Sequence, residues 1–438
     1  MIEVEDRLAE LRELGLHRRM RLVSGPQGPR VVLDGKPVLL LCSNNYLGLA
    51  DHPRVREAAA EAAMRWGVGA GASRLVSGNM TIHRRLEERL ADFKGSPSVL
   101  LFGSGYLANT GVVAALAGAG DVVFSDALNH ASLIDGCRLA RAETFVYDHA
   151  DAEHLAWGLE KADGRGALIV TDSVFSMDGD VAPLGAIVEL ARRHGARVVV
   201  DEAHGTGCLG PGGRGAVAEA GLEDEVDVVI GTLGKALGSY GAYACCGPAM
   251  ARWLVNAART LIFSTGPSPP AVAGALAALE LLEREPQRVR RLERNAATLR
   301  DELAREGLPA GGSRTPIVPL VVGDAGAAMR LCEAALERGV FAQAIRPPTV
   351  PAGTSRLRLA VMASHTQAEL RGAARSLARA AQAAGFSPPP VTAPAPVGGG
   401  SREAAAPVVM AGEPPVPRAA RTRPFDVENE PEPVPRAA

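Results

Sequence analysis

From about residue 97 onwards, short apolar runs rich in β-branched residues alternate with stretches whose hydrophobic spacing suits helices. The runs lie at residues 122–124, 144–147, 168–170, 198–200 and 228–230. Short apolar runs predict strands buried on both faces, and their alternation with helices predicts a mostly parallel sheet covered by helices on both sides. The fold class expected for this region is therefore α/β.

Polar side chains follow four of these runs, at the point where each run ends. They are Asp126, Asn129 and His130 after the first run, Asp172, Ser173 and Ser176 after the third, Asp201 and His204 after the fourth, and Thr232 and Lys235 after the last. Ligands of open α/β sheets bind outside the carboxyl ends of the strands. We therefore expect these side chains to converge on one site at that edge of the sheet.

The rest of the chain differs in character from this region. Residues 1–20 are expected to form an amphipathic helix, because leucines recur there at helical spacing. Residues 272–305 also suit a helix, and a smaller α+β unit then extends to about residue 385, with strands near 317–322 and 356–361.

The last segment has a different composition. Residues 388–438 contain 13 prolines and no Leu, Ile, Trp or Tyr, which predicts a disordered tail. The predicted parts are an N-terminal helix and arm at 1–45, a large α/β domain at 46–285, a small α+β domain at 286–386 and the tail at 387–438.

Charge and composition narrow the class of function. Lys and Arg together number 47 and Asp and Glu 49, a formal net charge of −2, so no excess of positive charge indicates a nucleic-acid partner. The six cysteines form no C-x-x-C pair and are expected to be reduced thiols. The chain begins with acidic residues and has no clean apolar stretch long enough to span a membrane. These features predict a cytoplasmic enzyme with no membrane or nucleic-acid partner.

Two segments carry the clearest chemistry. Asp201 and His204 lie three residues apart after one apolar run, and Thr232 and Lys235 lie among glycines after another. A carboxylate can keep a pyridine nitrogen protonated, and an amine in a small, apolar neighbourhood can form a Schiff base. These two groups are the smallest set of side chains that pyridoxal 5'-phosphate (PLP) chemistry requires. The ordinary alternative is that Lys235 is a surface lysine.

Two other interpretations of these segments fail on spacing. The letters D-E-A-H at 201–204 also occur in ATP-driven helicases, but Val229 and Ala236 break the required phosphate loop. Glycines at 205, 207 and 210 match a dinucleotide-binding pattern, yet Pro211 and two glycines follow where its helix should begin. We therefore discard both the helicase and the dinucleotide-binding hypotheses.

Three further motifs allow a functional and an ordinary interpretation. His130 is either a helix-start residue or a flat ring that stacks on a cofactor. The glycine-rich turn at 103–109 is either a simple helix cap or a phosphate site. Arg356 and Arg358 share one face of a predicted strand, which is either solvated or suited to a substrate carboxylate.

Three segments beyond these motifs support a family resemblance. They read CSNNYLGL at 42–49, GASRLVSG at 71–78 and IRPPTVPAGT at 345–354. Together with the motifs around Asp201 and Lys235, they resemble the α-oxoamine synthase family of fold-type I PLP enzymes over about residues 15–380. The resemblance implies the PLP-dependent aminotransferase-like fold and PLP as cofactor, with no departure at a catalytic position.

The resemblance also implies a role for individual residues. Lys235 would hold PLP as a Schiff base, Asp201 would face the pyridine nitrogen, His204 and Ser176 would lie near the phenolic oxygen, and His130 would stack on the ring and contact substrate. Gly105, Tyr106 and Thr232 would face the phosphate, with Ser264 and Thr265 contributed from a partner subunit. Arg358 would bind the amino-acid carboxylate, while Arg18, Asn44 and Thr349 would lie on the acyl-substrate side.

The implied reaction is a decarboxylative condensation of L-alanine with a pimeloyl thioester, carried by CoA or an acyl-carrier protein, in biotin biosynthesis, by a homodimer. The segment at 345–354 favours this member of the family. The alternatives are a sister enzyme that condenses glycine or serine with another acyl-CoA, and a catalytically silent PLP-fold subunit. Retention of Lys235, Asp201, His204 and His130 argues against the silent subunit.

Overall fold

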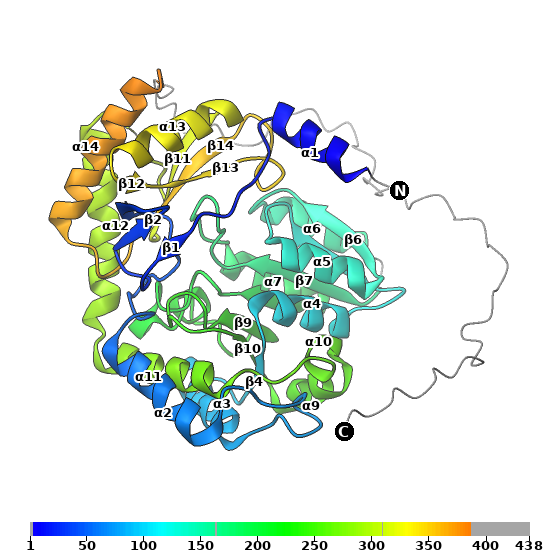
Figure 1. Cartoon of the computed structure of the whole chain (residues 1–438). Coiled ribbons are helices and arrows are strands. Elements are labelled where there is room, and N and C mark those ends of the chain that lie inside the picture. Colours follow the sequence, from blue (N-terminus) through cyan, green and yellow to red (C-terminus); the bar gives the residue numbers. More distant parts are fainter. Residues whose placement is uncertain (1–2, 163, 309, 387–438) are drawn as a thin grey trace, which may run out of the picture. The chain divides into compact units, whose positions relative to one another are not determined.

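A computed structural model describes residues 3–386 of the chain, except residues 163 and 309. The predicted disordered tail at 387–438 lies outside the described residues. Figure 1 shows a large sheet with helices on both sides and a smaller group of strands and helices built from the two ends of the described chain. The predicted domain boundaries stay predictions.

A seven-stranded sheet forms the centre of the large region, and its fold class is the predicted one. The strand order is β4 (Ser98–Phe102), β10 (Ala242–Cys246), β9 (Val228–Thr232), β8 (Arg197–Asp201), β7 (Ala167–Asp172), β5 (Val122–Asp126) and β6 (Glu143–Tyr147). Only β10 runs antiparallel to its neighbours. All five predicted runs are strands, whereas β4 and β10 complete the sheet without having been predicted.

Each face of this sheet carries its own apolar core, because successive side chains of a strand point to opposite faces. Val198 and Val200 of β8 belong to one core and Val199 to the other. The helices on the Val199 side are α4 (Gly105–Leu116), α5 (Ala131–Ala140), α9 (Pro248–Ala257) and α10 (Arg259–Ile262). Those on the Val198 side include α2 (Pro53–Trp66), α3 (Thr81–Lys94), α6 (Ala152–Glu160), α7 (Leu184–His194) and α11 (Pro269–Arg284). The strands are therefore buried on both faces, as predicted, except β6, which is the last strand of the sheet and leaves Glu143, Thr144 and Val146 exposed.

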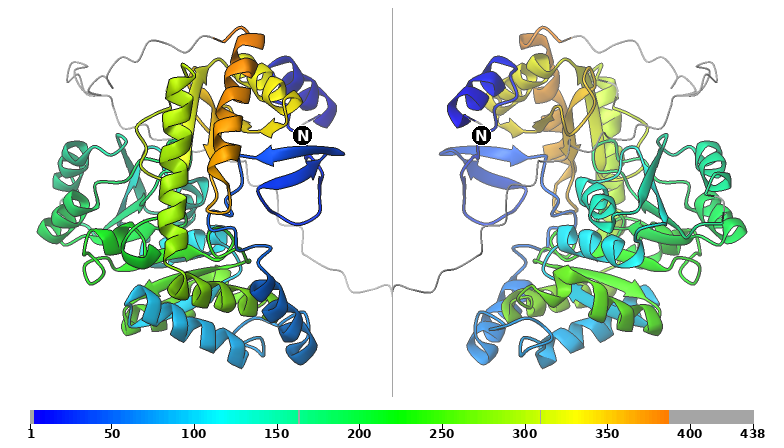
Figure 2. Two further views of the ribbon diagram at one scale, coloured as in Figure 1. Left: turned by 90° about the vertical axis from the view of Figure 1, so that its left-hand side faces the viewer. Right: turned by 90° about the vertical axis from the view of Figure 1, so that its right-hand side faces the viewer.

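The smaller region joins the two ends of the described chain. Its antiparallel sheet has the order β11 (Ile317–Gly323), β14 (Ser355–Ala360) and β13 (Gln343–Ile345), and its helices are α12 (Gln287–Arg305), α13 (Ala325–Glu337) and α14 (Gln367–Ala383). A second sheet has the order β1 (Val23–Ser24), β2 (Arg30–Leu33), β3 (Lys36–Leu40) and β12 (Val340–Phe341). Figure 2 shows α12 and α14 side by side. Because β3 pairs with β12, the N-terminal arm packs onto the C-terminal unit.

Two predicted helices differ from the observed ones. The helix expected at 1–20 is α1 (Val4–Glu13), which ends early because Gly15 adopts a left-handed conformation with φ 65°. The helical region at 272–305 is divided between α11 and α12, because Pro286 has no amide hydrogen to continue the hydrogen-bond ladder. Within the described part of the chain, no helix is long and apolar enough to cross a membrane.

A buried ion pair anchors the end of α3 beneath the sheet. Lys94 Nζ contacts a carboxylate oxygen of Glu202 and the carbonyl oxygen of Arg214, and both charged side chains are almost fully inaccessible to water. Glu202 also accepts hydrogen bonds from the Val217 amide at 2.7 Å. Glu202, the second residue of the D-E-A-H motif, is thus structural. It ties the loop after β8 to the end of α3.

Removal of one partner should leave the other charge buried and unpaired. We expect Lys94→Met to lower the free energy of unfolding by about 3–5 kcal/mol. Arg84→Met, on the same helix but in the exposed pair Arg84–Glu88, should lower it by at most about 1 kcal/mol. Urea denaturation followed by tryptophan fluorescence compares the two variants. Equal losses would show that the buried pair contributes no more to the free energy of unfolding than the exposed pair does.

Candidate active site

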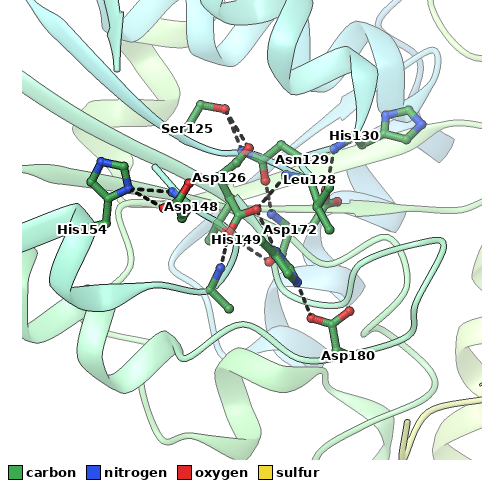
Figure 3. A network of polar contacts seen from close by, with 12 residues as sticks. Ser125, Asp126, Leu128, Asn129, His130, Asp148, His149, His154, Asp172 and Asp180 are labelled. Atoms are coloured by element: carbon green, nitrogen blue, oxygen red, sulfur yellow. Dashed lines mark hydrogen bonds and ion pairs between the residues drawn. The ribbon is translucent and has the colours of Figure 1, made fainter. Parts of the chain in front are cut away.

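The carboxyl ends of β5, β7, β8 and β9 bring the predicted polar residues to one edge of the sheet. Asp201 ends β8 and lies in register with Asp172, which ends β7. His130 follows β5 and begins α5, and Figure 3 shows its backbone amide facing Asp172. That amide donates to Asp172 Oδ2 at 2.6 Å. The convergence expected from the sequence is therefore present.

Asp201 is a buried carboxylate held by neutral donors. Its Oδ2 accepts from Asn109 Nδ2 at 2.6 Å, and its Oδ1 accepts from the Ala203 amide at 2.7 Å. None of the ion pairs formed by the described residues involves Asp201. A buried negative charge without a cationic side chain as partner suits a cationic ligand group, such as a protonated pyridine nitrogen.

Lys235 and His204 form the next part of the site. Lys235 Nζ lies 2.8 Å from His204 Nε2, and His204 Nδ1 lies 2.7 Å from Tyr46 Oη. Burial lowers the pKa of His204 well below its usual value, and the charges of Lys235 and Arg358 lower it further. The imidazole is therefore neutral at pH 7.

The hydrogen bonds around Tyr46 assign the tautomer of His204. The hydroxyl of Tyr46 donates to Asn44 Oδ1 at 3.2 Å and accepts from Arg358 Nη2 at 3.1 Å. Since the one hydroxyl proton is used, His204 Nδ1–H donates to Tyr46 and His204 Nε2 accepts from the Lys235 amine. Burial raises the pKa of Tyr46 to about 12, so its hydroxyl stays protonated.

The amine of Lys235 is closer to its neutral form than an ordinary lysine. Loss of water around it lowers its pKa to about 8, although the carboxylates of Asp201 and Asp172 oppose the shift. An amine with that pKa is neutral in roughly a quarter of molecules at pH 7.5, against about one in a thousand for an exposed lysine. Such an amine can attack a carbonyl group and later accept a proton.

A second hydrogen-bonded chain joins His130 to Asp201. His130 Nδ1 lies 2.7 Å from Ser132 Oγ, which accepts from Asn109 Nδ2 at 2.8 Å. The same Asn109 amide donates to Asp201. Partial burial lowers the pKa of His130, and the charge of Lys235 adds to this effect while Asp201 opposes it. The ring predicted to stack on a cofactor is thus linked to the carboxylate predicted to bind its nitrogen.

Arg358 and Asn44 lie at the other end of the site. Arg358 is almost fully buried, and it donates to Asn44 Oδ1 at 3.1 Å, to Tyr46 Oη and to the carbonyl oxygen of Ser176. Its neighbour on the same strand face, Arg356, is paired with Asp178. The two arginines share a face as expected, but only Arg358 joins the Lys235–His204–Tyr46 chain.

The remaining predicted residues lie around this centre with simpler contacts. Gly105 and Tyr106 are the first residues of α4, where amide N–H groups have no carbonyl partner within the helix. Thr232 Oγ1 donates to the Gly241 carbonyl at 3.1 Å. Thr265 pairs with Ser73 in an isolated bridge next to Ser264. Their assignment to a phosphate group stays a prediction.

Two of the acyl-side residues meet at the 345–354 segment. Arg18 Nη2 donates to the Pro347 carbonyl at 3.3 Å, and the Thr349 amide donates to the Arg346 carbonyl at 3.1 Å. The N-terminal arm therefore contacts the segment that carries Thr349, although the two residues lie more than three hundred positions apart in sequence. Their contact with an acyl substrate stays a prediction.

Two residues of the site were not predicted to take part. Tyr46 lies inside the segment 42–49, which carries the family resemblance. Asn109 ends the turn 103–109, which was predicted to be a helix cap or a phosphate site. Their partners, His204 and Asp201, are distant in the chain. Only the fold shows that each connects two predicted residues.

The residues fit PLP. Asp201 offers a buried acceptor without a competing cation, Lys235 offers an amine with a lowered pKa, and the helix start at Gly105 offers free amide hydrogens. No cluster of His, Cys, Asp and Glu among the described residues is arranged to hold a metal ion. The carboxylate, the amine and the amide hydrogens together suit an organic cofactor with an anionic group.

Comparisons with known proteins agree with this fit. A family model described as aminotransferase class I and II matches residues 36–377. The chain is 53% identical over 375 residues to the 8-amino-7-oxononanoate synthase of Geobacter sulfurreducens, a match that covers 85% of this chain and 96% of the relative.

Solved structures show the same relationship. The structure of serine palmitoyltransferase (SPT) with its PLP internal aldimine is similar at a TM-score of 0.83 and 33% identity, covering 87% of this chain and 97% of that one. The structure of 8-amino-7-oxononanoate synthase from Francisella tularensis gives a TM-score of 0.68 and 26% identity, covering 79% and 98%. The predicted family, fold and cofactor are confirmed. The chain belongs to the class I and II aminotransferase family, as a PLP-dependent acyltransferase of the 8-amino-7-oxononanoate synthase type.

Proposed function

We propose that this protein condenses L-alanine with a pimeloyl thioester, carried by CoA or an acyl-carrier protein, to give 8-amino-7-oxononanoate, CO₂ and the free thiol carrier in biotin biosynthesis. The name shared with its relatives supports the product. One structural observation supports the chemistry. A continuous chain of hydrogen bonds runs from Lys235 through His204 and Tyr46 to Arg358. It joins the amine suited to hold the cofactor to the guanidinium suited to hold a carboxylate.

When bound, PLP supplies a sink for the electrons released at the α-carbon of the amino acid. Asp201, whose buried carboxylate accepts from neutral donors, would hold a proton on the pyridine nitrogen of the cofactor and so favour this sink. Lys235 would hold the cofactor, and its amine, with its lowered pKa, would accept the α-proton of L-alanine. Arg358 binds the carboxylate of L-alanine and fixes which bonds face the base.

The second half of the reaction concerns the thioester. The α-carbon of L-alanine attacks the thioester carbonyl, a C–C bond forms, the C–S bond breaks and the thiolate leaves and takes up a proton. His130 donates a hydrogen bond to the carbonyl oxygen, while Arg18, Asn44 and Thr349 position the acyl chain. Loss of CO₂ then leaves a carbanion, which takes up a proton to give the amino ketone.

The remaining assignments of the cofactor site are also part of this proposal. Ser176 and His204 would hold the phenolic oxygen of PLP, and Gly105, Tyr106 and Thr232 would hold its phosphate. Ser264 and Thr265 complete the phosphate site from a second copy of the chain. We assign the strongly exposed side chains of Phe263, Val76 and Met64 to the interface of such a homodimer.

We place the reaction in the cytoplasm. All six cysteines are free thiols, and five of them are buried. This pattern is typical of proteins from a reducing compartment.

SPT structures favour a second candidate, a sister enzyme that uses serine or glycine. Their TM-score exceeds that of the 8-amino-7-oxononanoate synthase structure, whereas the sequence identity to relatives of that name is higher than to SPT. Discrimination of one methyl group is worth about 1–3 kcal/mol, so the amino acid must be tested directly.

The amino acid is identified by titration of the PLP-loaded protein, followed by visible absorbance. L-Alanine should shift the cofactor band at a concentration at least about tenfold lower than glycine, which lacks the methyl group, or L-serine, which adds a hydroxyl group. Pimeloyl-CoA and the pimeloyl carrier protein, added in parallel with L-alanine, should release free thiol and CO₂. A preference for glycine or serine with another acyl-CoA would contradict the proposal and indicate the sister enzyme.

Removal of the amine should abolish the reaction. Lys235→Ala should lose turnover and the visible absorption band, because no side chain remains to hold the cofactor or move the α-proton. Lys161→Ala is the matched control, since this exposed lysine lies at the end of α6, outside the site. Thiol release and absorbance spectra measure both variants. Near-normal activity of Lys235→Ala would disprove the assigned mechanism.

The carboxylate assignment is tested at Arg358. Arg358→Gln should raise the KM for L-alanine by about 30- to 1,000-fold, corresponding to about 2–4 kcal/mol for a buried charged pair. Arg358→Lys keeps the charge but not the planar fork, so it should give a smaller increase. Retention of the cofactor band shows that either variant is folded. If the KM stays unchanged in Arg358→Gln, another group binds the carboxylate.

A further inference from the structure

His149 lies between two carboxylates that belong to different loops of the catalytic edge (Figure 3). It belongs to the short loop between β6 and α6. Its Nδ1 lies 2.9 Å from Asp126 Oδ1, and its Nε2 lies 2.8 Å from Asp180 Oδ2. Both ring nitrogens are thus used, which requires that both carry a proton, since each faces an acceptor.

Asp126 controls the loop that presents His130. It ends β5, and its side chain is almost fully buried. Besides His149, its carboxylate accepts from the amides of Leu128 and Ala150, each at 2.8 Å. Leu128 is two residues before His130, so this carboxylate fixes the path of the chain into α5.

Asp180 closes the loop that presents Ser176. Its carbonyl accepts from the Phe175 amide at 3.0 Å. The Ser176 carbonyl in turn accepts from Arg358, and Asp178 pairs with Arg356. The loop between β7 and α7 is therefore one of the supports, beside Asn44 and Tyr46, of the guanidinium that we assign to the amino-acid carboxylate.

On its other side this loop is held through its backbone, where the Gly179 carbonyl accepts from Ser313 Oγ at 2.7 Å. Residues 178–181 line a cavity of about 430 Å³ together with residues 311–314 of the smaller region. One carboxylate oxygen of Asp180 has no partner among the described residues. The contact with His149 is thus a main constraint on the position of the Asp180 side chain.

The charges around His149 favour its doubly protonated form. Burial opposes that form, but hydrogen bonds and charges of Asp126 and Asp180 outweigh it and raise the pKa of His149 to about 10. The edge of the ring packs on Phe175, which is uncharged, with centroids 4.3 Å apart at 88°. Asp148, the adjacent charge on its own loop, is held by His154 at 3.2 Å. The cation is therefore retained from acid to mildly alkaline pH and is lost as the pH rises through about 10.

We infer that His149 is a positioning residue for the condensation, because its side chain joins the loop that carries His130 to the loop that supports Arg358. This inference rests on the proposed function. In this role His149 sets the distance between His130, which we propose stacks on the cofactor, and Arg358, which we propose binds the amino-acid carboxylate. His149 itself contacts neither substrate nor cofactor.

The test compares His149→Phe and His149→Gln with His154→Gln as matched control. His149→Phe keeps a ring against Phe175 but donates to neither carboxylate, while His149→Gln keeps the polarity without the charge. His154 lies on α6, pairs only with Asp148 in its salt bridge and contacts neither catalytic loop. If His149→Phe does not fold, His149→Gln carries the test.

The PLP-loaded proteins are titrated with L-alanine and followed by visible absorbance and visible circular dichroism. Both His149 variants should keep the cofactor band, raise the dissociation constant of L-alanine at least tenfold and change the dichroism of the bound cofactor, because His130 moves relative to it. His154→Gln should match the unmodified protein. Affinity and dichroism unchanged in both His149 variants would overturn the inference.

The pH dependence separates positioning from general destabilisation. The ratio of the dissociation constants of His149→Gln and the unmodified protein should fall towards one as the pH rises through about 10, because the unmodified protein then loses the same charge. A ratio that is constant with pH would show that the charge of His149 does not act on the site.

Nitrogen NMR of the ¹⁵N-histidine-labelled, PLP-loaded protein tests the charge without any substrate. Both His149 nitrogens should remain protonated at pH 8.5. A titration near the ordinary histidine value of about 6.5 would overturn the inference. Failure of the proposed function would show instead as no response of the unmodified protein to L-alanine, in which case NMR and dichroism still decide the role of His149.

Discussion

The parallel pairing of β5, β7, β8 and β9 is the constraint on which the rest of the structure depends. Parallel strands begin at one edge of a sheet and end at the other, so residues that follow four distant apolar runs meet in one place. Both faces of the sheet are covered by helices, which leaves this edge as the place where backbone and side chains can meet a ligand. The direction of the strands, more than any single residue, therefore determines where the site forms.

Burial then turns ordinary side chains into reactive ones. Lys235 loses water and its pKa falls to about 8, while His204 becomes a neutral acceptor for that amine. Asp201 accepts hydrogen bonds from two neutral donors, Asn109 and the Ala203 amide. The same environment makes unpaired groups costly. Two hydrogen-bonded chains, through Tyr46 and through Asn109, link the polar side chains of the site, although Asn109 Oδ1 has no partner among the described residues.

The sequence predicted what depends on local pattern. Five of the seven strands, the polar residues at their ends and the mostly parallel sheet follow from apolar runs and their periodicity, and Lys235, Asp201 and His204 follow from their place after those runs. Contacts between distant segments could not be predicted in the same way. Tyr46 meets His204 and Asn109 meets Asp201 only because the arm and α4 pack against this edge. Likewise His149 follows a strand as the other residues do, but its two partners come from other loops.

The most direct test of this account asks which amine holds the cofactor. The chain has only four lysines, Lys36, Lys94, Lys161 and Lys235. Borohydride reduction of the PLP-loaded protein fixes the cofactor to the amine that binds it, and mass spectrometry of the peptides then identifies the residue. The account predicts one modified peptide, which contains Lys235. Modification of Lys36, Lys94 or Lys161 in its place would contradict the assignment of the catalytic edge.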